Sequence, residues 1–289
     1  MNGHNLPAGS RYSVMFRRLL DKLILYLVLL SVAAITVFPF VWILFTSFKG
    51  PNDPIVSVPP QLIPQDPTFA NYIRVWGQLP IGRFYLNSIV VSLSVVVLNT
   101  LFSALAAYPL AKMNFKGREV IFYSLLATFI VPPVLTSIPS FILAVKVFHY
   151  YDKIVSVIFP YLVTVINIFL LRQAFKSVPD DLIDAGRIDG AGELRIWWSI
   201  LLPIVRPSLA TVAIITFVEQ WNNFFWPSLM LHTDEQMTLQ VGLVALQGAF
   251  LNDARGIAAG VVMTVVPMII FFAALQKQFI RGLTGAVKG

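Results

Sequence analysis

The sequence predicts an all-α integral membrane protein with six transmembrane helices. Its 289 residues are 57% hydrophobic and only 12% charged, and the mean hydropathy is +0.77. Soluble domains carry about twice that charged fraction. The charges are also spaced so that six long, nearly neutral gaps remain, each close to the roughly 20 residues that cross a bilayer as a helix. A β-barrel would show short alternating segments instead.

The six predicted spans are separated by polar links. They run Leu23–Phe48, Phe84–Ala111, Val120–Val145, Ile154–Leu171, Pro207–Thr233 and Gly256–Gln276. Backbone in lipid must satisfy its own hydrogen bonds, so each span should be helical. The first is too long for a signal peptide and lacks a small-residue cleavage site, and we expect it to be retained. Pro132, Pro133 and Pro139 predict a kinked or broken third span.

The basic residues predict the orientation of the chain. Fifteen of the 21 Lys and Arg residues lie in the termini and in the second and fourth links, and six lie in the other links. Because Lys and Arg concentrate in cytoplasmic loops, both termini should be cytoplasmic. We expect a cytoplasmic segment at 1–22, one six-helix domain at 23–280 and a cytoplasmic tail at 281–289. The net charge of +7 reflects this anchoring and not a nucleic-acid surface.

The links differ in length and composition. The first, over 50–80, is rich in Pro, Asp and Asn, which predicts extended, turn-punctuated structure outside the membrane. The second and third links are short, so spans two, three and four should be sequential antiparallel neighbours. The fourth, over about 172–206, holds five of the fourteen acidic residues together with five basic ones. Such a charged, partly apolar knob suits docking in a groove of a soluble partner.

Local signals in this fourth link predict two short helices. Ser177 can cap the first helix, and Gly186 and Gly190 weaken or end it. A second helix is expected over 191–202, stopped by Pro203. Within the first, Asp184, Ile188 and Ala191 should share a face at helical spacing.

The segment DAGRIDGAGELRIWWSILLPIVRP, which begins at Asp184, resembles the cytoplasmic loop of binding-protein-dependent ABC permeases. The matching positions are Asp184, Ala185, Gly186, Asp189, Gly190, Ala191, Leu202 and Pro203. The length, WNNFFWP at 221–227 and RGLTGAVKG at 281–289 extend the resemblance to carbohydrate-importer permeases of the maltose-permease-like second-subunit kind. The resemblance implies the type I ABC importer fold, with a coupling helix between helices 4 and 5 that enters a cleft on the ATPase. The alternative is a generic amphipathic loop.

Two positions depart from the family pattern. Asp184 stands where Glu is usual, and Gly186 stands where Ala is usual. The charge at the first position is kept, but its reach is one methylene shorter, so a basic partner on the ATPase should be displaced correspondingly.

The resemblance also implies a location in the plasma (inner) membrane of a prokaryote, a set of partners and a solute class. The partners are a second homologous permease, two ATPase subunits and an extracytoplasmic solute-binding protein that the segment His232–Asp253 helps to receive. The solute would be a sugar or a related polyhydroxy compound. The chain has no GxxxxGK[ST] phosphate loop, so we expect that it is not an enzyme and holds no cofactor. ATP and Mg would be bound by the ATPase subunits.

Glu219 is the only charged residue well inside a predicted span, and such residues are costly and functional by default. With Trp221, Asn222 and Asn223 it forms a polar and aromatic cluster that could line the translocation pathway or bind sugar hydroxyls. The same groups could instead bridge helices or the partner permease. Adjacent to the fifth span, Trp197 and Trp198 should mark the membrane interface.

Other functions compete with sugar import. A permease for glycerol phosphate, amino acids or metals would differ in its solute, and the absence of Lys and Arg from every span favours a neutral one. A secondary transporter would use midmembrane acidic residues and inverted repeats, for which Glu219 alone is thin support. A membrane enzyme or metal site needs clustered groups, whereas His4, His149 and His232 lie far apart and cysteine is absent.

Overall fold

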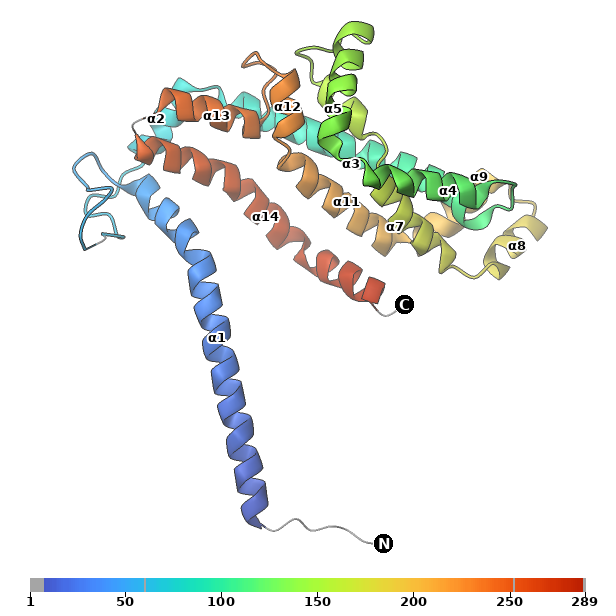
Figure 1. The fold of residues 1–289 in the computed structure, drawn as a ribbon, viewed down its shortest axis with the longest axis horizontal. Helices are drawn as coiled ribbons and strands as arrows, with labels where there is room; N and C mark the ends of the chain where they lie inside the picture. Colours follow the sequence, from blue (N-terminus) through green and yellow to red (C-terminus); the bar gives the residue numbers. More distant parts are fainter. Residues whose placement is uncertain (1–7, 60, 252, 288–289) are drawn as a thin grey trace. The chain divides into compact units, whose positions relative to one another are not determined.

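The computed structural model describes residues 8–59, 61–251 and 253–287, with side chains placed over 19–59, 61–251 and 253–273. All regular structure in these ranges is helical (Figure 1). The chain divides into two compact units, Met1–Tyr72 with Asp253–Val262, and Ile73–Asn252 with Met263–Gly289. Of the predicted tail at 281–289, the last two residues lie outside the described ranges and the side chains of the others are not placed.

Among the described residues, three helical stretches are long and apolar enough to cross a membrane alone. They are Leu19–Phe48 within α1 (Ala8–Phe48), α3 (Ile81–Lys112), and Ala254–Ala273 within α14 (Ala254–Val287). They coincide with the predicted first, second and sixth spans. The helix that carries the first span begins earlier than predicted, at Ala8.

The rest of the apolar sequence forms shorter helices. These are α4 (Arg118–Ala127), η1 (Thr128–Ile130), α5 (Pro133–Ile142), η2 (Leu143–Val147), α6 (Val155–Ile158), η3 (Phe159–Tyr161), α7 (Val165–Lys176), α8 (Asp181–Ile188), α9 (Glu193–Ile196), η4 (Trp197–Leu201), α10 (Leu202–Ile204), α11 (Arg206–Trp221), α12 (Phe225–Met230) and α13 (Leu239–Ala249). Three bent pairs arise from them: Arg118–Ile130 with Pro133–Val147 at 99°, Val155–Tyr161 with Val165–Lys176 at 43°, and Glu193–Ile204 with Arg206–Trp221 at 80°. Counting each pair as one span gives up to six by length and composition.

The predicted break in the third span is confirmed. Val131 is extended (φ −83°, ψ 116°) and Pro132 continues the extended backbone (φ −58°, ψ 132°). The residue before a proline is disfavoured in the helical region, because its backbone clashes with the proline ring. The double proline at 132–133 therefore ends one helix and starts the next.

The predicted fifth span, Pro207–Thr233, is wrong in its extent. α11 ends at Trp221, and a separate helix, α12, begins at Phe225. Pro227 explains the interruption, because its ring would clash with the carbonyl four residues earlier, at Asn223, and it has no N–H to donate. Hydropathy alone does not predict this break, since the residues on both sides of it are apolar.

The external link after the first span is not wholly extended. It ends in α2 (Ala70–Gln78), so the expectation of extended structure over 50–80 is wrong for those nine residues. The earlier part folds around two buried charged side chains, Lys49 and Asp53. Lys49, 1% exposed, donates to the carbonyls of Pro54 and Gln61 at 2.7 Å each. Burial would raise the pKa of Asp53, but backbone N–H donors and Lys49 hold it below its ordinary value.

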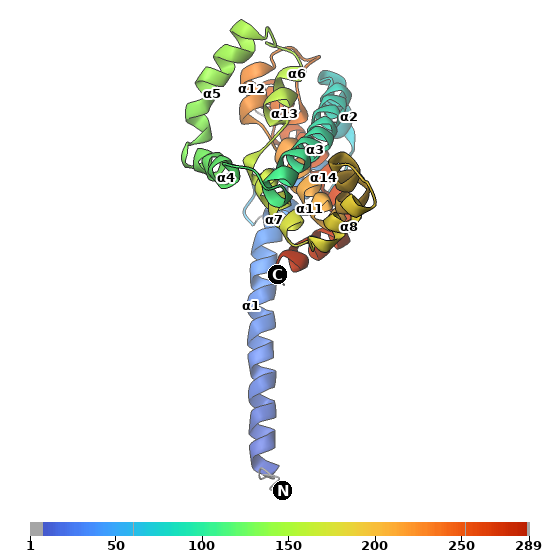
Figure 2. The ribbon, with the colours of Figure 1, turned by 90° about the vertical axis from the view of Figure 1, so that its right-hand side faces the viewer.

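The second unit is organised around α3, which packs mainly on α7 and α11, as Figures 1 and 2 show. The expectation that spans two, three and four are sequential neighbours is therefore wrong for spans two and three. The α4 helix meets α3 over few residues, and its exposed apolar side chains include Val120 and Ile121. The core holds the C-terminal half of α3, much of α7 and the inner faces of α8 to α10.

Polar side chains join the three central helices at their crossing. Asn99 on α3 donates to the Tyr161 carbonyl at 2.8 Å and accepts from Asn167 on α7 at 2.6 Å. Asn167 also donates to the Thr216 hydroxyl on α11 at 2.9 Å. Asn99, Asn167 and Thr216 are each at most 2% exposed, so they serve as the interhelical polar contacts that membrane bundles favour. The predictions from sequence did not include this group, although Asn99 and Asn167 are polar residues inside two of the predicted spans.

A buried arginine holds the C-terminal end of α7, which the predicted topology puts on the cytoplasmic side. Arg172 is 2% exposed, and its Nε donates to the Leu110 carbonyl at 2.9 Å. One guanidinium nitrogen contacts Glu119 at 2.7 Å, and the group lies 3.7 Å from the centre of the Phe122 ring. These contacts compensate for burial of the charge.

Candidate functional site

Residues 180–196, which contain α8 and α9, form the knob that carries the motif residues. α8 ends in a Schellman motif: the N–H of Gly190 donates to the Arg187 carbonyl at 3.0 Å, and that of Ala191 to the Gly186 carbonyl at 2.9 Å. Gly190 has φ +76°, a conformation that glycine adopts without steric cost. The prediction that Gly190 ends the first helix is confirmed.

Gly186 has a different role, inside α8. A Cβ added there would lie 2.8 Å from Cδ1 of Ile200 and 3.3 Å from Cγ1 of Ile196. α8 therefore packs closely on η4 at this residue, and alanine, which the family pattern has here, would require the end of the Ile200 side chain to move.

Charged side chains tie the knob together and to α3. Nε of Arg187 lies 3.0 Å from Glu193, and another of its nitrogens lies 3.2 Å from Asp184. The Tyr108 hydroxyl on α3 donates to the other oxygen of Glu193. α8 and α9 are thus linked to each other by Arg187 and to α3 by Tyr108.

A second link to α3 is made by Lys112. Its Nζ lies 2.5 Å from both the Asp180 carboxylate and the Val178 carbonyl, and its side chain is only 5% exposed. The hydrogen bond and the positive charge of Lys112 hold the pKa of Asp180 below its ordinary value. The Asp180 side chain therefore does not cap α8.

Two predicted helix signals are wrong. The Ser177 hydroxyl donates to the Ala174 carbonyl at 2.8 Å, within the preceding helix, and leaves α8 uncapped. Pro203 does not stop the second helix, which passes through η4 and α10 and breaks at Val205. η4 is a π-helical turn, and Pro203 follows it at the start of α10.

The motif residues differ in exposure. Asp184, Ala185, Asp189 and Gly190 are exposed, Ala191 is half-buried and Gly186 is buried. Ala191 lies beyond the end of α8, so the expected shared face with Asp184 and Ile188 is wrong for it. Two large apolar side chains, Ile188 and Leu194, are 86% and 74% exposed on the same knob.

The second predicted cluster lies where α11 breaks. Glu219 occupies the last turn of α11 and is exposed, although a carboxylate is electrostatically unfavourable at a helix C-terminus. Trp221 is 3% exposed, stacks on Phe217 at 5.7 Å between ring centres, and has no hydrogen-bond acceptor for its indole N–H among the described residues. The structure therefore does not bring all four pathway residues to one face.

The two asparagines of this cluster bond locally. Asn222 is exposed and donates to the Val218 carbonyl at 2.8 Å. Asn223 donates to the Gln220 side chain at 3.4 Å and also hydrogen-bonds the Tyr161 side chain. Asn223 thus touches the fourth predicted span, as interhelical bridging would require, whereas Asn222 satisfies its own helix end.

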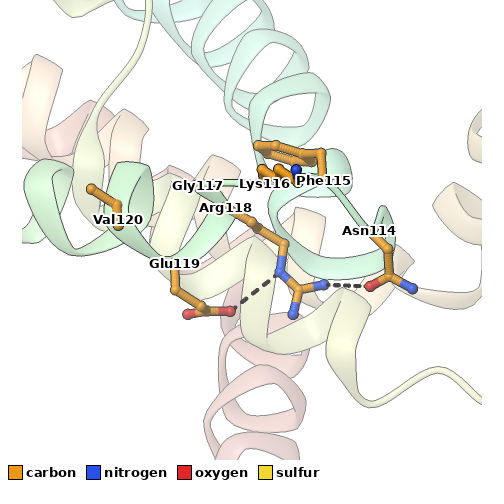
Figure 3. A pocket seen from close by; sticks show the side chains of 7 residues that line it. All are labelled: Asn114, Phe115, Lys116, Gly117, Arg118, Glu119 and Val120. Atoms are coloured by element: carbon orange, nitrogen blue, oxygen red, sulfur yellow. Dashed lines mark hydrogen bonds and ion pairs between the residues drawn. The ribbon is translucent and has the colours of Figure 1, made fainter.

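A cavity of about 480 Å³ lies elsewhere, in the turn between α3 and α4 (Figure 3). Its lining is one continuous stretch, 114–120, in which Arg118 contacts both Asn114 and Glu119 at 3.3 Å. It shares no residue with the knob or the polar cluster. Among the described residues, no group of three or more His, Asp or Glu side chains is arranged to hold a metal ion.

Comparison with known proteins identifies the fold and the family. The model for "Binding-protein-dependent transport system inner membrane component" matches residues 99–285. The chain is 37% identical to the arabinooligosaccharides transport system permease protein of Halalkalibacterium halodurans over 262 residues, 89% of this chain and 93% of the relative. The protein of that name from Bacillus subtilis is 34% identical over 96% of this chain and 99% of its own length.

A solved structure shows the same fold. One chain of a bacterial ABC transporter involved in the import of the acidic polysaccharide alginate superposes with a TM-score of 0.75 at 24% identity, over 95% of this chain and 99% of that one. The resemblance predicted from the motif in the fourth link is confirmed. The chain belongs to the family of binding-protein-dependent transport system inner membrane components.

Proposed function

We propose that this chain is the permease subunit of an inner-membrane ABC importer that carries an oligosaccharide or a related polyhydroxy solute. The observation that carries the proposal is the family match over most of the chain, together with relatives that are arabinooligosaccharide permeases. Each bent pair of helices would count as one span, which gives six and would put both termini on one side of the membrane. The excess of Lys and Arg in the termini and in the second and fourth links favours the cytoplasmic side.

The proposal includes three kinds of partner: a second homologous permease, two ATPase subunits that bind ATP and Mg, and an extracytoplasmic solute-binding protein. The knob would contact an ATPase. In support, its tip presents Asp184 and Asp189 beside exposed Ile188 and Leu194, a mixture of charged and apolar groups typical of an interface. The cost of exposing two such large apolar side chains to water favours a covering partner.

A neutral solute is favoured over a phosphorylated one. Two cations near the predicted spans, Arg172 and Lys112, are paired within the chain with Glu119 and Asp180. Neither is therefore free to bind a phosphate, and no Lys or Arg lies inside any predicted span. Along the proposed pathway, exposed Glu219 and Asn222 at the end of α11 offer acceptors and a donor suited to sugar hydroxyls.

The first test is purification of the chain from its native membrane in mild detergent, with mass spectrometry of the proteins that accompany it. We expect a phosphate-loop ATPase and a second permease, and the associated binding protein should bind arabino-oligosaccharides in a thermal-shift screen. If the chain purified alone and moved solute without ATP, the importer assignment would be refuted.

The coupling role of the knob needs its own test in the reconstituted importer. Asp184→Lys should lower solute-stimulated ATP hydrolysis and uptake without changing the amount of chain in the membrane, because Asp184 is exposed and its ion pair with Arg187 lies at the surface. Lys176→Glu, a charge reversal on the exposed end of α7, serves as a matched control. Wild-type uptake by Asp184→Lys would contradict the role of this carboxylate.

A further inference from the structure

Two side chains of α3 reach the knob from one face of that helix. Tyr108 and Lys112 are four residues apart, which places them one turn from each other on the same face. Tyr108 is 5% exposed and meets the Phe175 ring edge to face, with 6.2 Å between ring centres. The side chain of Lys112 is also 5% exposed. Both side chains are therefore held by packing, and each ends in a polar group.

These two polar groups hold the knob at two points. Nζ of Lys112 contacts Asp180, directly before α8, as well as the Val178 carbonyl. The Tyr108 hydroxyl donates to Glu193, the first residue of α9. In sequence, α8 is thus flanked on both sides by residues that are attached to α3.

A chain of polar contacts leads from the second attachment point to the exposed tip of the knob. Arg187, in the last turn of α8, donates at 3.0 Å to the Glu193 oxygen that Tyr108 does not contact. Another nitrogen of the same guanidinium lies 3.2 Å from Asp184. Asp184 is the exposed carboxylate that we propose for the ATPase contact, and successive hydrogen bonds through Arg187 and Glu193 connect it to Tyr108.

These polar contacts give the knob a fixed orientation more than they give it stability. Apolar burial already holds the knob to its unit, since Ile183 and Ile196 belong to the same buried core as Tyr108. Burial of apolar surface has no preferred direction, so apolar faces can slide past each other. Hydrogen bonds require a narrow range of distance and angle and resist that sliding. Ion pairs that are partly exposed to water contribute little stability, and the Asp180 side chain is 77% exposed.

We propose that Tyr108 and Lys112 are positioning residues for the coupling step: they fix the knob against α3, so that α3 moves with the knob when an ATPase displaces it. The proposal rests on the proposed contact between the knob and an ATPase. α3 can carry the displacement because it is continuous over 32 residues and packs along α7 and α11. Neither residue belongs to the exposed tip, so replacing them should leave ATPase binding intact.

The test uses the complete importer in proteoliposomes and measures the amount of solute taken up per ATP hydrolysed. Tyr108→Phe keeps the packed ring and removes only the hydroxyl. We expect this ratio to fall roughly fivefold, the effect of losing one hydrogen bond, while the chain stays inserted and the ATPase stays bound. Tyr123→Phe removes the hydroxyl of an exposed tyrosine on α4 and should keep the wild-type ratio.

Lys112 provides an independent variant if Tyr108→Phe fails to assemble. Lys112→Met keeps most of the aliphatic stem and removes the ammonium group, so the contacts with Asp180 and the Val178 carbonyl are lost. We expect the ratio of uptake to hydrolysis to fall to a similar degree. Lys116→Met, at an exposed lysine in the link after α3, is the matched control.

A double-mutant comparison separates positioning from a general loss of stability. Glu193→Leu removes the acceptor of the Tyr108 hydroxyl, so adding Tyr108→Phe to it should lower the ratio no further. Glu193→Gln keeps an acceptor oxygen and should retain more of the ratio than Glu193→Leu. If the two single losses instead multiplied in the double variant, the residues would act independently and the proposal would be overturned.

The remaining outcomes separate this proposal from the proposed function. If no ATPase accompanied the wild type, the proposed function would fail and this proposal with it. If the wild type transported solute and both Tyr108→Phe and Lys112→Met kept its ratio, the positioning role would be overturned and the importer assignment would stand. If both variants lost the bound ATPase, the contacts would serve docking and not transmission, which would also overturn the proposal.

Discussion

Replacing Gly190 tests the proposed coupling role through backbone conformation alone. A Cβ at this residue would meet nothing within 4 Å, so the effect of Gly190→Ala comes from φ, which is +76°. A left-handed conformation costs a residue with a Cβ about 1–2 kcal/mol, a five- to thirtyfold shift against the closed Schellman motif. Gly190→Pro is more severe, because proline cannot adopt this φ and removes the N–H that donates to Arg187 at 3.0 Å.

The assay is uptake and ATP hydrolysis by the reconstituted importer, with and without solute-loaded binding protein. We expect Gly190→Ala to lower both rates together and Gly190→Pro to abolish the stimulation of ATP hydrolysis by solute. The amount of inserted chain should not change, because Gly190 is exposed. Gly192→Ala is the matched control: Gly192 has φ −71°, and a Cβ added there would meet nothing within 4 Å, so alanine is tolerated.

Wild-type coupling by Gly190→Pro would contradict the coupling role of the knob, because the Schellman motif cannot close around a proline at this position. Loss of the chain from the membrane would show instead that the knob is needed for assembly. Equal losses in Gly192→Ala and Gly190→Ala would exclude the backbone conformation as the cause, since of these two glycines only Gly190 has a positive φ.

Three further predictions concern the contacts that hold the helices. Lys112 holds the pKa of Asp180 below its ordinary value, so their contact stabilises the fold at neutral pH and is lost when acid protonates Asp180. The difference in melting temperature between the wild type and Asp180→Asn should therefore become smaller as the pH is lowered. Asn167→Leu removes donors to two helices and should cost about 1 kcal/mol, seen as a lower melting temperature of the purified complex, whereas an unchanged value would argue against the polar junction. Arg172→Lys keeps the charge but loses the stacking on Phe122 and the hydrogen bond to the Leu110 carbonyl. We expect the stability of the complex to fall by about 2 kcal/mol, seen again as a lower melting temperature.

Hydropathy predicted the parts of the fold that depend on composition alone. The spans in α1, α3 and α14 follow directly from neutral gaps of sufficient length. The breaks in the other spans depend on local backbone chemistry, and only the one marked by a double proline, at 132–133, was predicted. Pro227 also marks a break, but a single proline is tolerated inside long helices, as Pro109 in α3 shows.

The knob was located from the sequence because its chemistry is local. The Schellman motif spans six consecutive residues, and its glycine is visible in the pattern. The local pattern at Ser177, in contrast, wrongly predicted that this residue caps α8. Asp180, at the N-cap of α8, is paired with Lys112 at the end of α3, 68 residues earlier, and a pair so distant in sequence is not visible in a local pattern. The buried junction around Asn99 was missed for the same reason, since it joins three helices distant in sequence.

Two of the knob's connections to the rest of its unit are a bent stretch of chain and a set of side-chain contacts to α3. The chain itself leads through η4 and α10 to Val205, where the path bends by 80° before α11 begins. The side-chain connection runs from Asp180 and Glu193 to Lys112 and Tyr108, four residues apart on the same face of α3. A bend can absorb displacement, whereas α3 is continuous over 32 residues and packs along α7 and α11. If an ATPase moves the knob, the displacement should therefore reach the membrane core through α3 before it reaches α11.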